Sequence, residues 1–357
     1  MLSNQTINLK SRAVFFQRAL WLGEWCLVGL CLLACNGCVQ QHDNQVVVFC
    51  ALDRVFSESQ LADFTKTTGI VVQPKFDTES TKTVGLVNQI LEQADRGVCD
   101  VFWNNEILHT LRLKRAGLLV PFVLEDAVHF PAEFRCPDGQ WYGLAARARV
   151  LIVNTNLLPD PAQYPTSFDD LADPKWKGRG CLAKPLFGTT ATHFAVLYQR
   201  MGSEKFTEFV AQLSANNVGI LSGNRQVAAD VAAGKYAFGW TDTDDYQVEK
   251  LDGSPVALVY PDQAVDQMGC LLLPNTIAII KGGRNESQAQ ALVKHVLAGP
   301  VESALAQSPS AQFPLDRRVQ VRSALLPEDN VRWMTVDWER SVEAWDAANP
   351  ILQKVFY

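Results

Sequence analysis

The sequence lacks the short motifs that mark the common enzyme classes. It contains no G-x-S-x-G turn, no H-E-x-x-H helix and no G-x-x-x-x-G-K-[ST] phosphate-binding loop. No nucleophile can be matched with an oriented base either. We therefore predict that the protein is not an enzyme and carries no catalytic cofactor.

An excess of basic charge is also absent. The chain has 32 Lys and Arg against 38 Asp and Glu, a net charge of −6, which argues against binding to nucleic acid. Its apolar fraction of 48% is ordinary for a globular protein, so we expect a packed core. Because 357 residues exceed what one hydrophobic core usually supports, we expect two lobes.

The cysteines beyond the N-terminal region form no recognisable framework. They are odd in number and widely spaced, and no pair lies two to four residues apart with a matching second pair. This excludes a disulfide scaffold and a structural zinc site, although the pairing of individual cysteines stays open. The residues concerned are Cys50, Cys99, Cys136, Cys181 and Cys270.

A long apolar run occurs near the N-terminus, from Ala19 to Ala34, after three basic residues. It is short for a membrane span and has the layout of a secretory signal. Its end, Leu32-Leu33-Ala34-Cys35, is similar to the bacterial lipobox, whose cysteine is acylated after cleavage. We predict a lipoprotein signal peptide over residues 1–34, a tether over 35–44, and an exported protein anchored to the membrane by lipid on Cys35.

Two alternatives stay open for this region. Cys38, preceded by Gly37, offers a second cleavage site. Cys35 and Cys38 also have the spacing of a thioredoxin-type redox pair, but that motif needs a following βα unit, and a polar linker follows here.

Strand-like and helix-like segments alternate beyond Gln45. Residues 46–50 form a continuous apolar run, as in a strand buried on both faces of a parallel sheet. A helix is expected to follow and to end at Thr68-Gly69, and the same pattern then repeats. The alternation indicates a doubly wound α/β lobe, in which ligands bind beyond the carboxyl ends of the strands. Further strands are expected at 70–74, 100–103, 148–153, 237–240, 256–260 and 271–273, a second helix at 81–94, and helices laid across a lobe at 327–357.

Four segments carry a resemblance to a known family. In order and spacing they resemble the periplasmic ferric-iron-type extracellular solute-binding proteins of ABC importers, from Gln45 to about Leu315. The resemblance implies the type II periplasmic-binding-protein fold, which is α/β with two doubly wound lobes, a central ligand cleft and two crossover segments. The segments are Phe76-Asp77-Thr78-Glu79-Ser80-Thr81-Lys82-Thr83, Asp100-Val101-Phe102-Trp103-Asn104-Asn105-Glu106, Ala183-Lys184-Pro185-Leu186-Phe187-Gly188-Thr189-Thr190-Ala191-Thr192-His193 and Gly239-Trp240-Thr241-Asp242-Thr243-Asp244-Asp245.

The resemblance also implies an organisation and partners. Residues 45–147 and 256–357 would form the first lobe and 148–255 the second, closing by hinge bending near 145–151 and 251–256. The protein would act as a monomer that delivers a small ligand to an ABC-importer permease and its ATPase. A sensory subunit is the alternative, because both roles depend on cleft closure.

The sequence departs from the iron binders at one place. Those proteins hold iron with two adjacent tyrosines at the start of a second-lobe helix. Here the corresponding place carries Asp244-Asp245, with Tyr246 beside them. The resemblance therefore implies the binding role, while the identity of the ligand stays open.

The carboxylates of the expected cleft point to a hard cation. Ferric iron and similar ions prefer oxygen ligands, and converging carboxylates repel one another unless a cation lies between them. Aspartates after a strand also commonly cap helices, which is the alternative here. The predicted ligands of a transported ferric iron or related cation are Glu79, His193, Asp242, Asp244 and Asp245, with Glu106 as a further carboxylate.

Neighbouring residues point to an anion. A glycine-threonine turn at a helix N-terminus presents N–H groups, hydroxyls and a positive dipole end, and arginine or lysine nearby adds charge. The anion could accompany the metal. Alternatively, the ligand is an organophosphate or phosphonate, whose amino or hydroxyl groups bind the aspartates and which stacks on tryptophan. The predicted ligand-binding residues are Thr78, Ser80, Thr81, Trp103, Asn104, Arg149, Gly188, Thr189, Thr190 and Trp240, with charge also from Arg147 and Lys184.

Overall fold

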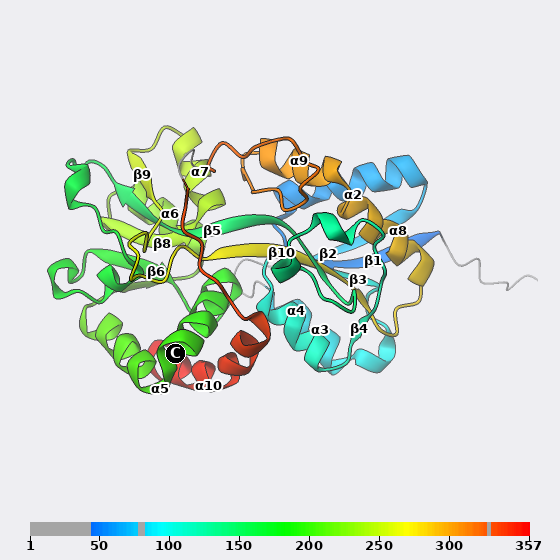
Figure 1. The fold of residues 1–357 in the computed structure, drawn as a ribbon, viewed down its shortest axis with the longest axis horizontal. Coiled ribbons are helices and arrows are strands. Elements are labelled where there is room, and N and C mark those ends of the chain that lie inside the picture. Colours follow the sequence, from blue (N-terminus) through cyan, green and yellow to red (C-terminus); the bar gives the residue numbers. More distant parts are fainter. Residues whose placement is uncertain (1–43, 78–82, 327–329) are drawn as a thin grey trace, which may run out of the picture. The chain divides into compact units, whose positions relative to one another are not determined.

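The computed structural model describes residues 44–77, 83–326 and 330–357 (Figure 1). Residues Gln45–Tyr357 form one compact unit. The predicted signal peptide and Cys35 lie outside the described residues. Within the described part, no helix is both long and apolar enough to cross a bilayer.

The first lobe begins with the predicted β-α-β-α-β alternation. Strand β1 pairs in parallel with β2 and β3, and its buried valines explain the apolar run in the sequence. Pro74 is tolerated in β2 because this strand lies at the edge of the sheet. Helix α2 ends at Gly69, whose φ of 72° suits glycine. The elements are β1 (Gln45–Cys50), α2 (Arg54–Thr68), β2 (Val71–Phe76), α3 (Val84–Glu92), β3 (Val101–Asn104), α4 (Leu108–Arg115) and β4 (Leu119–Val120).

The second lobe has the same alternating construction. Strand β6 pairs in parallel with β7 and β8, and helices α5, α6 and α7 follow these three strands. All three helices therefore begin at the carboxyl ends of parallel strands, where α/β proteins bind ligands. The elements are β6 (Gly180–Ala183), α5 (Gly188–Ala215), β7 (Gly219–Leu221), α6 (Asn224–Ala232), β8 (Phe238–Asp242), α7 (Thr243–Leu251) and β9 (Val256–Val259).

Two long strands join the lobes, β5 (Tyr142–Asn154) and β10 (Leu272–Ile280). The first half of β5 pairs with β10, whereas its second half pairs with β8 and β9. The sheet order is β2-β1-β3-β10-β5-β8-β6-β7. Because β9 stays paired with β5 in the second lobe, the chain returns through β10, later than the return near Val256 that we expected. Figure 1 shows both strands running between the two halves of the unit.

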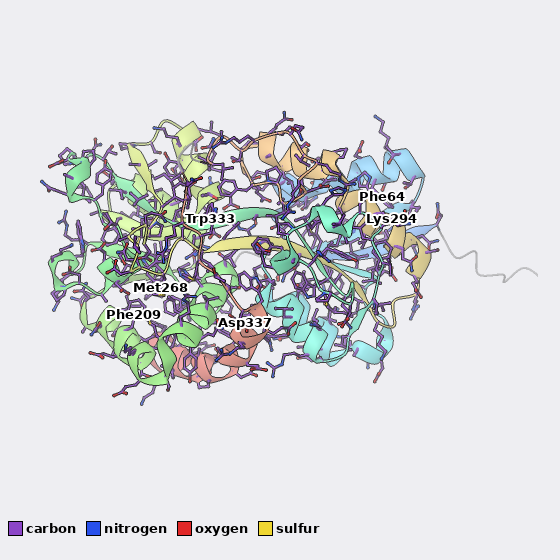
Figure 2. All side chains as sticks on the ribbon, viewed as in Figure 1. Phe64, Phe209, Met268, Lys294, Trp333 and Asp337 are labelled. Carbon is purple, nitrogen blue, oxygen red and sulfur yellow. The ribbon has the colours of Figure 1, made fainter. Side chains whose placement is uncertain are left out.

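The C-terminal part covers both lobes. Helices α8 (Glu286–Val296) and α9 (Gly299–Gln307) precede an extended segment, and α10 (Trp338–Phe356) packs mainly on α5 and also on α4. Trp338 and Trp345 are buried in α10, which lies within the range 327–357 where we expected helices. Trp333, labelled in Figure 2, lies before it in the extended segment, and its ring contacts those of Tyr260 and Phe313. Short 3₁₀ helices occupy Ala94–Arg96, Ala127–His129, Ala132–Phe134, Pro161–Gln163, Phe168–Leu171 and Pro174–Trp176.

Candidate functional site

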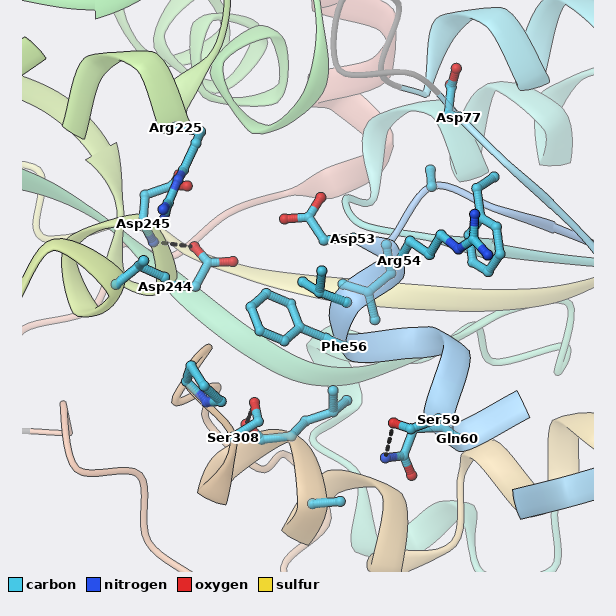
Figure 3. A pocket seen from close by; sticks show the side chains of 18 residues that line it. Asp53, Arg54, Phe56, Ser59, Gln60, Asp77, Arg225, Asp244, Asp245 and Ser308 are labelled. Carbon is cyan, nitrogen blue, oxygen red and sulfur yellow. Dashed lines mark hydrogen bonds between the residues drawn. The ribbon is translucent and has the colours of Figure 1, made fainter. Parts of the chain in front are cut away.

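Two adjoining cavities lie where the first turns of α2, α5, α6 and α7 approach one another. The larger has a volume of about 620 Å³ and the smaller about 40 Å³. Leu52, Asp53, Asp244 and Asp245 line both, so the two cavities form one cleft. Figure 3 shows Asp53 and Phe56 on one side of the larger cavity, facing Asp244 on the other. The cleft therefore draws on both lobes.

Asp242 is a heavily bonded carboxylate of the cleft. Arg149 Nη1 lies 2.7 Å from its Oδ1, while Thr189 Oγ1 and Asn224 Nδ2 donate to its Oδ2 at 2.6 and 3.1 Å. Arg147 Nε lies 3.5 Å from the same oxygen. Burial alone would raise the pKa of Asp242, but the two arginines outweigh it, so its pKa lies below the ordinary value. Asp242 is thus ionised and already neutralised by the protein.

Asp244 and Asp245 open helix α7 and face the cavities. With Asp242 they form a group of carboxylates whose oxygens lie within 4.8 Å of one another. Arg147 Nε is 3.8 Å from Asp244 Oδ2, and Asp245 Oδ2 accepts from Thr241. Both aspartates also lie at a helix N-terminus, which favours negative charge. Among the described residues, this group has the oxygen chemistry that a hard cation requires.

The smaller cavity combines these aspartates with a wall of different chemistry. Gly188 (φ 55°), Thr189 and Thr190 form the first turn of α5, and all three line this cavity with Arg147 and Lys184. Asn224, at the start of α6, also lines it. Arg149 Nη2 donates a hydrogen bond to Thr190 Oγ1 at 3.3 Å and so helps to fix this turn. Helix N-termini, hydroxyls and basic side chains together can bind an anion.

Several predicted site residues lie in the protein core. Trp103 and Trp240 are completely buried and line neither cavity. His193 is buried between Phe168 and Trp240, at ring distances of 4.3 and 5.2 Å, and burial holds its pKa well below the ordinary value. Its ring nitrogens have no hydrogen-bond partner among the described residues, and it does not belong to the carboxylate group. The rings of Phe168, His193, Trp240 and Phe209, the last of which is labelled in Figure 2, pack together in the second lobe, whereas Trp103 lies in β3 of the first lobe.

Asn104 and Glu106 belong to a buried network beside the cleft. Asn104 Nδ2 donates to Glu106 Oε1 at 2.8 Å, and His109 Nδ1 lies 3.0 Å from the same oxygen. Thr192 of α5 donates to Glu106 Oε2 at 2.7 Å, so this network joins the two lobes. The predicted contacts Thr78, Glu79, Ser80 and Thr81 lie outside the described residues.

Sequence reasoning missed several residues that line the larger cavity. Asp53 follows β1 and begins α2, which is the position after a parallel strand where ligand contacts are expected. We expected ligand contacts directly after β8, and the same expectation applied to β1 would have identified Asp53. Other missed residues include Arg54, Phe56, Asp77, Arg225 and Ser308.

Comparisons with known proteins agree with this architecture. Residues 109–342 match the family described as bacterial extracellular solute-binding protein. The Fe(3+)-binding periplasmic protein of Serratia marcescens is 29% identical over 57% of this chain, and the match spans 58% of that relative. Iron uptake protein A1 of Synechocystis is 25% identical over 71% of each chain.

Solved structures share the fold. Iron-bound HitA from Pseudomonas aeruginosa superposes with a TM-score of 0.78 at 24% identity, covering 88% of this chain and 99% of that one. AfuA from Actinobacillus pleuropneumoniae, with fructose-6-phosphate bound, gives 0.75 at 20% identity, covering 87% and 97%. The two-lobe fold of periplasmic binding proteins is thereby confirmed. The matched family consists of binding proteins, in agreement with the prediction of no enzymatic activity. The chain belongs to the bacterial extracellular solute-binding protein family.

Proposed function

We propose that this protein is the ligand-capturing component of an ABC importer and that its ligand is ferric iron or a related hard cation. The carboxylates Asp244 and Asp245, directed into the cleft at the start of α7, carry this proposal. Asp53 lines the same cavity and faces Asp244 across it, so it adds an oxygen ligand from the first lobe. The names of the Serratia and Synechocystis relatives support iron as the cargo.

The neutralised Asp242 limits how the cation binds. Because Arg147 and Arg149 lie close to the carboxylates, a bare trivalent cation would meet two fixed positive charges. An anion bound in the smaller cavity, on Thr189, Thr190 and Lys184, would separate these charges. We therefore propose that the cation binds together with a synergistic anion.

A phosphorylated organic ligand is the second candidate. A volume of about 620 Å³ is much larger than an ion needs, and Phe56 offers an apolar surface. In this case the phosphate or phosphonate would occupy the smaller cavity, and the aspartates would bind hydroxyl or amino groups.

Thermal unfolding in the presence of defined ligands separates the two candidates. Chelator-treated protein would be heated with ferric citrate, ferric iron plus phosphate, manganese, zinc, phosphate alone, phosphonates and sugar phosphates. A ligand at 100 times its dissociation constant stabilises the fold by about 2.7 kcal/mol. We expect ferric iron with an anion to raise the midpoint and Asp244→Asn to abolish the rise.

The matched control is Asp252→Asn, an exposed aspartate at the other end of α7, which should leave the rise intact. If only a phosphorylated compound raises the midpoint, and Thr190→Val abolishes that rise while Asp244→Asn merely weakens it, the iron proposal is wrong and the second candidate takes its place.

The partners and the anchor extend the same proposal. We propose delivery to a permease and its ATPase by a monomer whose lobes close on the ligand, and lipid attachment at Cys35, supported by the lipobox-like sequence. Fatty-acid labelling of Cys35→Ser and Cys38→Ser variants tests the anchor, since only the first should lose the label. Uptake of radioactive iron by cells lacking the protein tests transport against a sensory role.

A further inference from the structure

The crossover strand β5 contains an irregularity beside the cleft. Its pairing with β10 runs Leu273 to Arg147 and then Asn275 to Leu144, so Ala145 and Ala146 together lie opposite Pro274. Ala145 has a φ of 41°, unusual for a residue with a side chain. Such a bulge bends a strand and is a natural place for lobes to move.

Residues that line neither cavity hold this bulge. Ala146 exchanges two backbone hydrogen bonds with Phe313, at 2.8 and 2.7 Å. The Ala145 N–H donates to the buried carboxylate of Glu302, 2.5 Å away, and Asn275 Nδ2 donates to the Ala145 carbonyl. Asn275 is fully buried. The bulge is therefore held on both its N–H and its carbonyl side.

Arg147 connects the bulge to the charges of the cleft. Its Nη1 donates to Asn275 Oδ1 at 2.7 Å, and its Nη2 donates to the Asn105 carbonyl in the first lobe. Its Nε faces Asp242 and Asp244 at 3.5 and 3.8 Å. A planar guanidinium with partners on three sides cannot turn toward one without disturbing the others.

We propose that Asn275 is a positioning residue that couples the occupancy of the cleft to the bulge in β5. A ligand at Asp244 changes the charge that Arg147 faces, Arg147 shifts against Asn275, and Asn275 transmits the shift to the Ala145 carbonyl. The inference rests on the proposed function, in which the lobes close on a ligand. It predicts that ligand affinity depends on Asn275, although this side chain does not line the cleft.

The test compares Asn275→Ala with Asn154→Ala. Both asparagines are buried and bond backbone carbonyls, but Asn154 Nδ2 donates to Val231, 2.8 Å away, and lies outside both cavities. Dissociation constants for ferric citrate and for inorganic phosphate would be measured by calorimetry, and the radius of gyration by small-angle scattering with and without each probe.

We expect Asn275→Ala to bind the probe that the wild type binds about tenfold more weakly, equivalent to about 1.4 kcal/mol, and to lose the contraction seen on binding. Asn154→Ala should keep both properties even though it is less stable. Equal affinities and equal contraction in the two variants would overturn the proposal.

Two further arms cover the remaining outcomes. If Asn275→Ala does not fold, Asn275→Asp keeps an acceptor for Arg147 but cannot donate to Ala145, and the same loss of contraction is expected. If the wild type binds neither probe, the proposed cargo is wrong, yet the ligand-free radius of gyration still tests whether Asn275 holds the bulge through which the coupling would act. We expect it to be larger in Asn275→Ala than in the wild type, and an unchanged radius would contradict the inference.

Discussion

Replacement of Asp242 by asparagine should destabilise the protein even when no ligand is present. The carboxylate accepts from Arg149, Thr189 and Asn224, and Arg149 is completely buried. The Asp242→Asn substitution would leave that guanidinium without its counter-charge and would present an amide N–H₂ to groups that donate. Loss of one partner of a buried ion pair costs about 3–5 kcal/mol. At about 2 °C per kcal/mol for a large domain, the unfolding midpoint should fall by roughly 6–10 °C.

The assay is thermal unfolding of chelator-treated wild type and Asp242→Asn, followed by circular dichroism. Asp252→Asn, exposed at the end of α7, is the control and should change stability by less than about 0.5 kcal/mol. A ligand-free Asp242→Asn as stable as the wild type would refute the reasoning. In an empty metal site, removal of one carboxylate relieves the repulsion between the carboxylates. Unchanged stability would therefore indicate that Asp242 is a metal ligand, as the sequence predicted.

Three other predictions test separate parts of the structure. Burial raises the pKa of Asp262 to about 6, so the folded state holds its proton more tightly than the unfolded chain. This contribution to stability is present below about pH 4 and is lost as the pH rises through about 6. In unfolding midpoints measured from about pH 4 to 8, Asp262→Asn should therefore flatten the pH dependence. Thr189→Val, which deletes the hydroxyl between Asp242 and Asn224, should lower stability by about 1 kcal/mol in a denaturant titration, while Thr189→Ser should not. The thiols of five cysteines are buried, so alkylation followed by peptide mapping should find them unreactive until the protein unfolds. Labelling of the native protein would contradict the packing of these residues, which are Cys50, Cys99, Cys136, Cys181 and Cys270.

The pattern of strands and helices could be predicted because it is local. The apolar runs at β1 and β3 and the glycine that ends α2 each lie within a few residues of the feature they determine. The positions of Asp244 and Asp245 followed in the same way, since residues after a buried parallel strand lie at the ligand-binding edge. The return of the chain was less predictable, because β9 could pair with either lobe and only its fit against β5 decides.

The roles of individual side chains depended on residues far away in the sequence. His193 and Trp240 have the composition of a binding site, yet Phe168 and Phe209 enclose them in an apolar cluster. Asp242 looks like its neighbours Asp244 and Asp245, but it is the one that reaches Arg149 and Thr189. Only the folded chain distinguishes these aspartates.

The sequence by itself determined the family, the two α/β lobes and the place where carboxylates and a glycine-threonine turn meet. The lobes follow from hydrophobic periodicity, which burial enforces locally. The family and the meeting place follow from the resemblance that short motifs carry. The tertiary structure alone decided which carboxylate is neutralised, which aromatic rings are core, and how Arg147 is joined to the bulge in β5. The reason is physical. Arg149 and Asp242 are 93 residues apart along the chain, and a charge is paired or available only according to what folding brings within about 3 Å of it.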